Sequence, residues 1–404
     1  MRLTRRAFGA TALAGAVSLT AGRGYAQATD KVKIGVLTDM SGVLSAVLGQ
    51  GSVDGTRMAV EDFGGTVNGM PVEVVFADHQ NKPDVGSAIA RRWLDQEGVD
   101  VITDLGNSAV AIACQTIVKE KNKIIIISGA SSSDLTGKFC NPHSFHWGYD
   151  TYMQSAGTAT ELTVQGGDSW FFLTADYAFG HALEGDATRK VEENGGKVLG
   201  KLRFPPNTLD MASLLLQAQT SKAKVIGLIA SGDDVDRLMK QGSEFGIWKK
   251  QKAAVFGLQL YNVMSIGAEN MEGVVHNSIF YWDRDDKARD FSRRFWKRNG
   301  KPPSEAHAIA YSAALQYLKA VRAAGTKDTS KIIKALNELP VDDLVTPNGK
   351  VRADGRLMRP TFLLEVKPKS EIKETWDVFK VAKELPAEKS FRPLSESACP
   401  LVKT

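Results

Sequence analysis

Residues 99–128 read VDVITDLGNSAVAIACQTIVKEKNKIIIIS, and this stretch decides the fold class. Two apolar runs, Val99–Thr103 and Lys123–Ser128, flank a helical pattern over Ala109–Lys121. Near-continuous runs of Val and Ile are typical of strands buried on both faces, as in parallel sheets that are covered by helices. The stretch therefore predicts an α/β fold with a parallel sheet.

The same alternation continues on both sides of this stretch. Before it, strands at Val32–Thr38 and Val72–Ala77 alternate with helices at Ser52–Phe63 and Val85–Gln96. Two successive series of this kind predict two Rossmann-like lobes, each with a parallel-sheet core. The strands and helices of the second series are expected at Trp170–Thr174, His181–Glu193, Val198–Phe204, Met211–Thr220, Val225–Ala230, Val235–Phe245 and Ala253–Gly257.

The C-terminal part of the chain has a different pattern. Helical periodicity predicts helices at Asp286–Arg298, Ala306–Ala324 and Ser330–Asn337. Pro360–Val366 and Thr375–Val381 have the composition of a β-pair. No low-complexity linker separates the lobes, so we expect the chain to cross between them through ordinary strand ends.

Residues 1–28 have the pattern of a cleavable export signal. A basic start precedes the mildly apolar stretch Ala7–Ala21, and small residues stand at Ala26 and Ala28. The apolar stretch is shorter than the roughly 20 residues needed to cross a bilayer. We expect cleavage near Ala28. Thr4–Phe8 resembles a twin-arginine signal, and the general secretory route is the alternative.

Removal of this segment changes the charge of the protein. The whole chain has a formal net charge of +5. All four charged residues of the segment are basic, so the remaining chain carries 47 Lys and Arg against 46 Asp and Glu. A near-neutral balance gives no basic face for nucleic acid. No later stretch is long and apolar enough to span a membrane, so we expect a protein that is not membrane-spanning after cleavage.

Export would bring the three cysteines of the chain into an oxidising compartment, where disulfides form. Cys114 lies in an apolar helical pattern, which predicts a buried thiol. Cys140 and Cys399 lie in loop sequences beside prolines. A disulfide between them would hold the C-terminal tail, although spacing alone also leaves them open as free thiols.

Motifs for catalysis and for cofactors are absent from the sequence. The six histidines are scattered, and we expect no metal site and no cofactor. There is no nucleophile elbow and no phosphate-binding loop of the Gly-x4-Gly-Lys type. Gly49–Gly55 resembles a dinucleotide fingerprint, but it lies too far beyond the strand that ends near Thr38. We therefore expect a loop that starts a helix, and no catalytic residue.

Small polar residues follow two neighbouring strands. Asn107 and Ser108 come after the first strand of the opening stretch, and Gly129–Asp134 comes after the second. Open α/β sheets bind ligands at the carboxyl ends of their strands. Hydroxyl groups and free amides there can hold an anion without a formal positive charge. The alternative is that these residues only cap helices.

Several short motifs resemble one known family in their order and spacing. The resemblance is to the branched-chain amino-acid (Leu/Ile/Val) binding proteins of ABC importers, which have the type I periplasmic-binding-protein fold, and it covers nearly the whole chain after the signal. The motifs are Met40-Ser41-Gly42, Ala59–Asp62, Asn68–Val72, Asp134-Leu135-Thr136, Asp176–Gly180, Gly242–Gly246 and Ala310–Ala313.

The resemblance implies two lobes that are joined by three hinge crossings and close over a small ligand. The N-terminal lobe would comprise residues 29–147 and 280–358, and the C-terminal lobe residues 148–279 and 359–385, followed by a tail at 386–404. The cleft between the lobes would be lined by Asn107, Ser108, Gly129, Ala130, Ser131, Tyr177, Phe179, Ser231, Gln259 and Trp282.

Two departures from the family pattern bear on the ligand. The family's amino-acid binders place a carboxylate near the position of Gln259 to hold the ligand's ammonium group. Glutamine supplies no counter-charge, and an unpaired ammonium in a closed cleft costs several kcal/mol. Ala46–Leu48 also stands where the family has an aromatic residue. We therefore expect either a small amino acid or a small carboxylate, which could be aromatic.

The resemblance also implies the partners and the compartment. These are a small-molecule ligand and the permease and ATPase subunits of an ABC importer, with the protein acting as a monomer in the periplasm. The alternative is a ligand-sensing module of the same fold that serves a receptor or regulator.

Overall fold

The structure is a computed structural model that describes residues 30–402. The expected export signal at 1–28, with its twin-arginine motif and cleavage point, lies outside the described residues. Residues 31–404 form one compact unit, of which the structure describes residues 31–402.

The first sheet has six strands in the order β2-β3-β1-β4-β5-β6. All neighbouring strands are parallel except β2 and β3, which form an antiparallel hairpin. The strands are β1 (Val32–Thr38), β2 (Thr66–Val67), β3 (Met70–Asp78), β4 (Val101–Asp104), β5 (Ile124–Ile127) and β6 (Ser144–His146).

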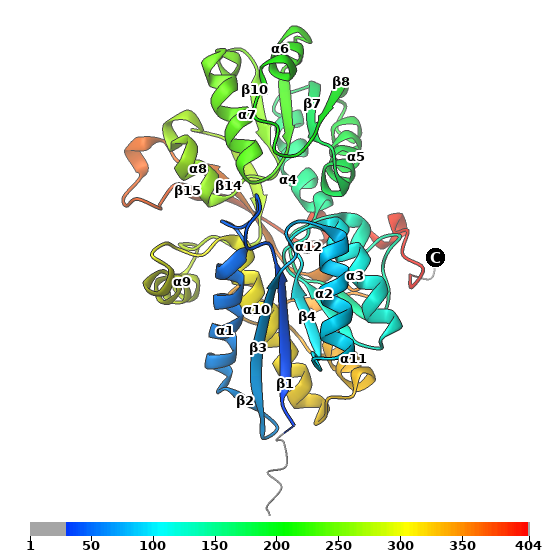
Figure 1. The fold of residues 1–404 in the computed structure, drawn as a ribbon. Helices are drawn as coiled ribbons and strands as arrows, with labels where there is room; N and C mark the ends of the chain where they lie inside the picture. The colour runs from blue at the N-terminus through cyan, green and yellow to red at the C-terminus, as the bar shows by residue number, and fades with distance from the viewer. Residues whose placement is uncertain (1–29, 403–404) are drawn as a thin grey trace, which may run out of the picture. The chain divides into compact units, whose positions relative to one another are not determined.

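Helices cover both faces of this sheet, as the continuous isoleucine run predicts (Figure 1). Ile124 and Ile126 belong to the core that α1 and α10 share, whereas Ile125 and Ile127 pack among residues of α2 and α3. Side chains alternate between the faces of a strand, so each face needs its own apolar residues. The helices are α1 (Gly49–Phe63), α2 (Pro83–Asp95), α3 (Ser108–Glu120) and α10 (Glu305–Ala324).

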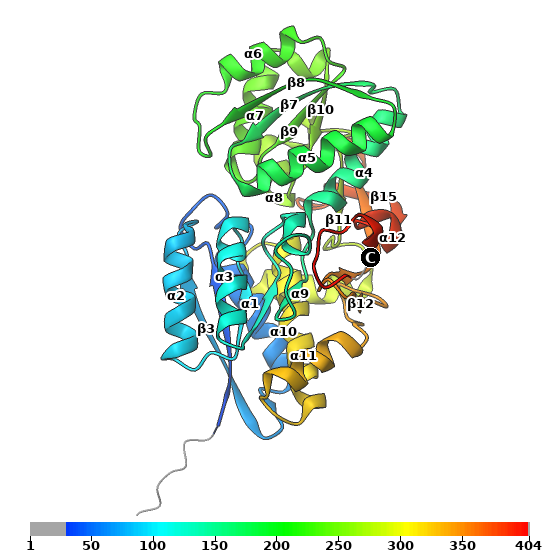
Figure 2. The same ribbon diagram turned by 90° about the vertical axis from the view of Figure 1, so that its right-hand side faces the viewer.

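The second sheet has four parallel strands in the order β10-β9-β7-β8 (Figure 2). Trp170 and Phe172 pack with residues of α4 and α5, and Leu173 faces residues of α6 and α7. The elements are α4 (Thr151–Val164), β7 (Ser169–Ala175), α5 (Ala178–Glu193), β8 (Lys197–Phe204), α6 (Ala212–Thr220), β9 (Val225–Ile229), α7 (Asp233–Glu244) and β10 (Lys252–Val255).

The chain passes three times between these two sheets. It leaves β6 for α4, returns after β11 to α9, α10 and α11, and leaves again into β14 and β15. The last two strands form an antiparallel sheet with β11, in the order β11-β14-β15. The elements concerned are β11 (Val275–Ser278), α9 (Asp286–Asn299), α11 (Thr329–Glu338), β14 (Thr361–Val366) and β15 (Phe379–Leu385).

Several element boundaries differ from the sequence-based expectation by a few residues, and two of them bear on the motifs discussed above. The strand expected from Thr375 begins at Phe379, because the Asp377 carboxylate accepts the backbone N–H of Lys373 and holds the preceding residues in a loop. Helix α1 begins at Gly49. A side chain at Gly55 would collide with the carbonyl of His307, so this glycine allows α1 to pack closely on α10 and has no dinucleotide role.

The C-terminal tail is attached to both halves of the compact unit. Cys140 and Cys399, the expected pair, form a disulfide with a Cα–Cα distance of 5.6 Å. Arg392 donates to Asp186 of α5 at 2.6 Å and to Ser133, before β6, at 3.0 Å. Cys114 is a buried free thiol, and burial raises its pKa to about 12. Within residues 30–402, no helix is long and apolar enough to cross a membrane.

Replacing both Cys140 and Cys399 by alanine removes a covalent link between residues 259 positions apart in the sequence. Loss of this constraint on the unfolded chain should lower the free energy of unfolding by about 2–4 kcal/mol. Urea unfolding of the oxidised proteins measures the change, and Cys114→Ala, which keeps the disulfide, is the control. A double variant as stable as the wild type would contradict the expected contribution of the disulfide.

Candidate functional site

A pocket lies among the loops that follow the strands of both parallel sheets. Residues after β1, β4, β5 and β6 form one side, and residues after β7, β9 and β10 form the other. The lining residues are Leu44, Val47, Leu48, Gly106, Ser108, Gly129, Ser131, Tyr149, Gln154, Tyr177, Phe179, Ser231, Gly232, Gly257 and Gln259.

The first side of the pocket follows from the pairing of β4 with β5. Asp104 and Ile127 pair at the ends of these parallel strands, so the loops that follow them begin next to each other. The backbone N–H of Ser132 donates to the Ser108 hydroxyl at 3.2 Å. This contact holds the two serine-containing loops together, with Ser108 and Ser131 in the lining.

The second side is built on the ends of β7, β9 and β10. The Tyr177 hydroxyl lies 2.9 Å from the Ser231 hydroxyl, and the ring centroids of Tyr177 and Phe179 are 5.6 Å apart. The backbone N–H of Gln259 donates to Asn262 at 3.0 Å at the start of α8 (Leu260–Ile266). Aromatic and polar groups therefore stand side by side on this wall.

Gly232 brings the two sides of the pocket close together. A Cβ atom on this residue would lie 2.5 Å from the carbonyl oxygen of Val43, in the loop after β1. Gly232 also has a φ of +58°, a left-handed conformation that favours glycine. A residue without a side chain is therefore needed where the second wall approaches the first.

Seven of the ten residues expected in the cleft line this pocket. They are Ser108, Gly129, Ser131, Tyr177, Phe179, Ser231 and Gln259.

Asn107 and Ala130 lie beside the pocket with other roles. The Asn107 side chain accepts hydrogen bonds from the backbone N–H groups of Ala109 and Val110 at 2.8 and 3.2 Å. Asn107 therefore caps α3, which is the helix-capping alternative that the sequence left open. The Ala130 carbonyl is 2.8 Å from Nε2 of the His146 ring.

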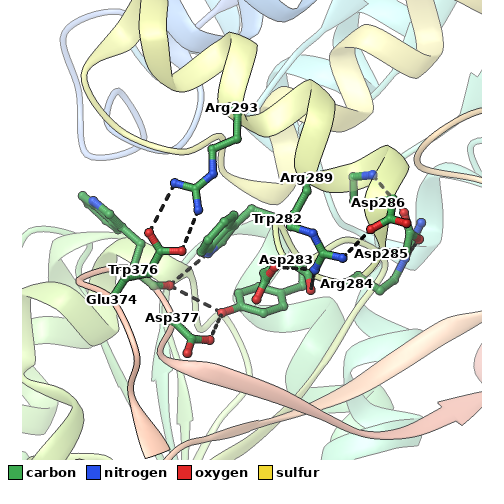
Figure 3. A network of polar contacts seen from close by, with 12 residues as sticks. Trp282, Asp283, Arg284, Asp285, Asp286, Arg289, Arg293, Glu374, Trp376 and Asp377 are labelled. Carbon is green, nitrogen blue, oxygen red and sulfur yellow. Dashed lines mark hydrogen bonds and ion pairs between the residues drawn. The ribbon is translucent and has the colours of Figure 1, made fainter.

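Trp282 lies in a separate aromatic cluster and does not line this pocket (Figure 3). Its indole N–H donates to the carbonyl of Trp376 at 2.9 Å. Arg293 lies over the Trp282 ring at 4.9 Å and pairs with Glu374 at 2.6 Å. These contacts join α9 to the loop before β15.

The sequence analysis missed eight lining residues, which are Leu44, Val47, Leu48, Gly106, Tyr149, Gln154, Gly232 and Gly257. Tyr149 follows β6 and Gln154 belongs to α4, and neither element was expected. The amide oxygen of Gln154 is buried without a hydrogen-bond partner.

The lining contains hydroxyl and amide groups but no lysine, arginine, aspartate, glutamate or histidine. Its two tyrosines are neutral at physiological pH, because burial raises the pKa of Tyr149 and of Tyr177 above the ordinary value. Within the described residues, no three His, Cys, Asp or Glu side chains form a group that could hold a metal ion. The lining therefore offers neutral hydrogen-bonding groups and aromatic surface to a small molecule.

Two parallel-sheet halves joined by three chain crossings, with a pocket at their strand ends, define a two-lobed solute-binding protein. The sequence profile described as "Periplasmic binding protein" matches residues 31–371, and the chain belongs to this family. The family and the fold are those of the solute-binding proteins of ABC transporters, which bind small molecules and work with a permease, and are not those of enzymes.

Solved structures and curated relatives that are similar to this chain agree with this family assignment. A periplasmic binding protein from Burkholderia mallei is 43% identical, with a TM-score of 0.91, covering 93% of this chain and 100% of that one. A branched-chain amino-acid ABC transporter ligand-binding protein from Burkholderia xenovorans is 39% identical, with a TM-score of 0.84 and coverages of 92% and 100%. Leu/Ile/Val-binding protein homolog 6 of Brucella abortus is 26% identical over 359 residues, covering 85% of this chain and 88% of its own.

The contact between Tyr177 and Ser231 can be measured by a double-mutant cycle. Tyr177→Phe and Ser231→Ala each remove one hydroxyl of this pair. A part-buried hydrogen bond of this kind should give a coupling energy of about 1 kcal/mol in urea unfolding. Additive effects of the two substitutions would show that the two hydroxyl groups do not interact.

Proposed function

We propose that this protein is the periplasmic solute-binding component of an ABC importer and that it captures a small carboxylate, aromatic or aliphatic, by closure of the two lobes. The observation that carries the proposal is the lining of the pocket, which offers hydroxyl and amide groups and an aromatic wall without any formal charge.

The absence of charge from the lining discriminates between ligand classes. A carboxylate can be held by neutral donors such as the hydroxyls of Ser108, Ser131 and Tyr149. An amino acid also brings an ammonium group, which needs a carboxylate partner when it is taken out of water. Gln259 supplies none. A free carboxylate therefore fits the lining better than a leucine-like amino acid.

The aromatic residues favour a planar ligand. Tyr177 and Phe179 lie together on one wall, and flat rings pack well against such pairs. A solute-binding protein from R. palustris with the same fold, 18% identical to this chain, was crystallised with benzoate. The apolar residues Leu44, Val47 and Leu48 would equally cover a branched aliphatic chain.

The remaining parts of the proposal concern export and partners. Met1–Ala28 would direct the protein to the periplasm, through the twin-arginine route, and be cleaved near Ala28. The closed protein would then dock as a monomer on a permease that a cytoplasmic ATPase drives. A receptor or regulator in place of the permease is the alternative, and gene neighbours that encode permease and ATPase subunits would favour import.

A thermal-shift screen tests the ligand class. The panel contains benzoate, 4-hydroxybenzoate, hexanoate, leucine, isoleucine and valine. A compound present at 100 times its dissociation constant adds about 2.7 kcal/mol to the free energy of unfolding, which raises the melting temperature by several degrees. We expect this from a monocarboxylate. A larger rise with leucine, isoleucine or valine, or no rise with any compound, would contradict the proposal.

A pair of variants shows whether a compound found in the screen binds in this pocket. Gly232→Ala places a methyl group against the Val43 carbonyl and should weaken binding at least about tenfold, equivalent to about 1.4 kcal/mol. Gly246→Ala is a control for replacing a glycine of positive φ outside the pocket: its φ is +65° and nothing lies within 4 Å of the added atom, while its ψ of 23° differs from the -139° of Gly232. Isothermal calorimetry on both variants, together with their melting temperatures without ligand, separates loss of binding from loss of stability.

A further inference from the structure

The floor of the pocket covers a buried acid. Asp104 ends β4 and is fully buried. Neither of its carboxyl oxygens has a hydrogen-bond partner, and no described lysine or arginine forms an ion pair with it. The backbone is left-handed at Asp104 and at Leu105, with φ values of +78° and +56°. Residues other than glycine rarely adopt this conformation, and it is held here by the surrounding structure.

Two glycines and the side chain of Leu48 lie next to this carboxyl group at the floor of the pocket. A Cβ atom on Gly129 would lie 2.5 Å from Oδ1 of Asp104, and 3.0 Å from both the Cα of Gly106 and a methyl carbon of Leu48. Gly106 and Gly129 both line the pocket. A ligand atom that rests on these glycines would therefore be one residue layer away from Asp104. Two unit charges that are separated by one such layer still repel each other inside a protein.

The surroundings of Asp104 disfavour its ionised form. Thr38 and Ser52 are its uncharged polar neighbours, and the Asp39 carboxyl adds a like charge. Burial raises the pKa of Asp104 to about 7, with Asp39 acting in the same direction and the two hydroxyls opposing. The carboxyl group therefore changes its charge near neutral pH.

Two other titratable groups beside this floor, Tyr149 and His307, keep their charge between pH 6 and 8.5. Tyr149, on the loop after β6, stays neutral because burial raises its pKa, and the charges of Glu305 and Asp104 act in the same direction. His307 of α10 bonds the carbonyl of Leu48, and burial lowers its pKa to about 3. Burial also lowers the pKa of His79, after β3, and Asp39 and Asp78 partly oppose this.

We propose that Asp104 is a specificity residue of the pocket, which must hold a proton for a carboxylate ligand to bind tightly. This inference rests on the proposed function. Below neutral pH the floor is uncharged and the hydroxyl groups of the lining hold the anion. Above neutral pH Asp104 ionises and places a negative charge beneath the ligand. Binding of a carboxylate therefore takes up a proton, and the affinity falls as the pH rises.

Calorimetry at pH 6 and pH 8.5 tests this inference. The probes are benzoate, 4-hydroxybenzoate and hexanoate, with leucine for comparison. For the wild type we expect the affinity for a carboxylate to fall by about threefold to thirtyfold between the two pH values. We also expect proton uptake, measured in two buffers of different ionisation enthalpy. Asp104→Asn, which cannot ionise, should bind with nearly the same affinity at both pH values.

Glu305→Gln tests the other buried acid near the pocket. Glu305 is also fully buried, its pKa is raised to about 7 by burial, and its charge acts on Tyr149, but its side chain accepts from Ser278 and Ile279 and does not line this pocket. This variant should keep the pH dependence of the wild type. Loss of the pH dependence in Glu305→Gln, or its persistence in Asp104→Asn, would overturn the assignment to Asp104.

The remaining outcomes separate the two proposals. If no probe binds at pH 6, the proposed function is contradicted. If a carboxylate binds equally well at both pH values, only the role of Asp104 is contradicted. If leucine binds more tightly at pH 8.5 and releases a proton, Asp104 acts as a counter-charge for an ammonium group, and both proposals are wrong.

If Asp104→Asn binds poorly, the pH dependence of its stability without ligand still tests whether Asp104 titrates. The raised pKa makes the folded wild type favour the protonated acid, so its stability falls as the pH rises from about 4 to about 7. The melting temperature of Asp104→Asn should change less over this interval. Equal pH dependence of the two proteins would show that Asp104 does not titrate in this range.

Discussion

The direction of parallel strands is the constraint on which this structure depends. All strands of a parallel sheet end at the same edge, so the loops after β4 and β5 begin side by side, and so do those after β7 and β9. The pocket is assembled from such loops on both halves of the chain. Gly232 permits close approach of the two halves at Val43. In the proposed function, the ligand would be held by groups whose positions the two sheets fix.

The fold could be predicted from the sequence because its strongest signals are local. The run Ile124–Ile127 and the helical spacing of α10 each identify one element without knowledge of the rest. Strand β6 and helix α4 could not be recognised in this way. Three residues are too few for a periodic signal, and α4 is buried on several sides and mixes polar with apolar residues. Tyr149 and Gln154 were missed for this reason.

The site was harder to predict, because small polar residues serve two purposes. Asn107 and Ser108 are neighbours of the same chemical kind, yet Asn107 caps α3 while Ser108 faces the pocket. Only the direction of each side chain distinguishes the roles, and direction is set by the backbone after β4. The left-handed Asp104 and Leu105 in that segment carry no recognisable sequence signal. The charge of the lining was easier to predict than its individual residues, because glutamine at position 259 already indicated a lining without a carboxylate.

The central claim is that a neutral pocket between two parallel sheets binds a carboxylate without a cationic partner. A crystal structure of the protein with the compound that stabilises it most tests this claim directly. The account predicts that the carboxylate group contacts hydroxyl or amide groups of Ser108, Ser131 or Gln154, with the rest of the ligand against Tyr177 and Phe179. A ligand bound outside this pocket, or one whose carboxylate pairs with a lysine or arginine, would contradict it.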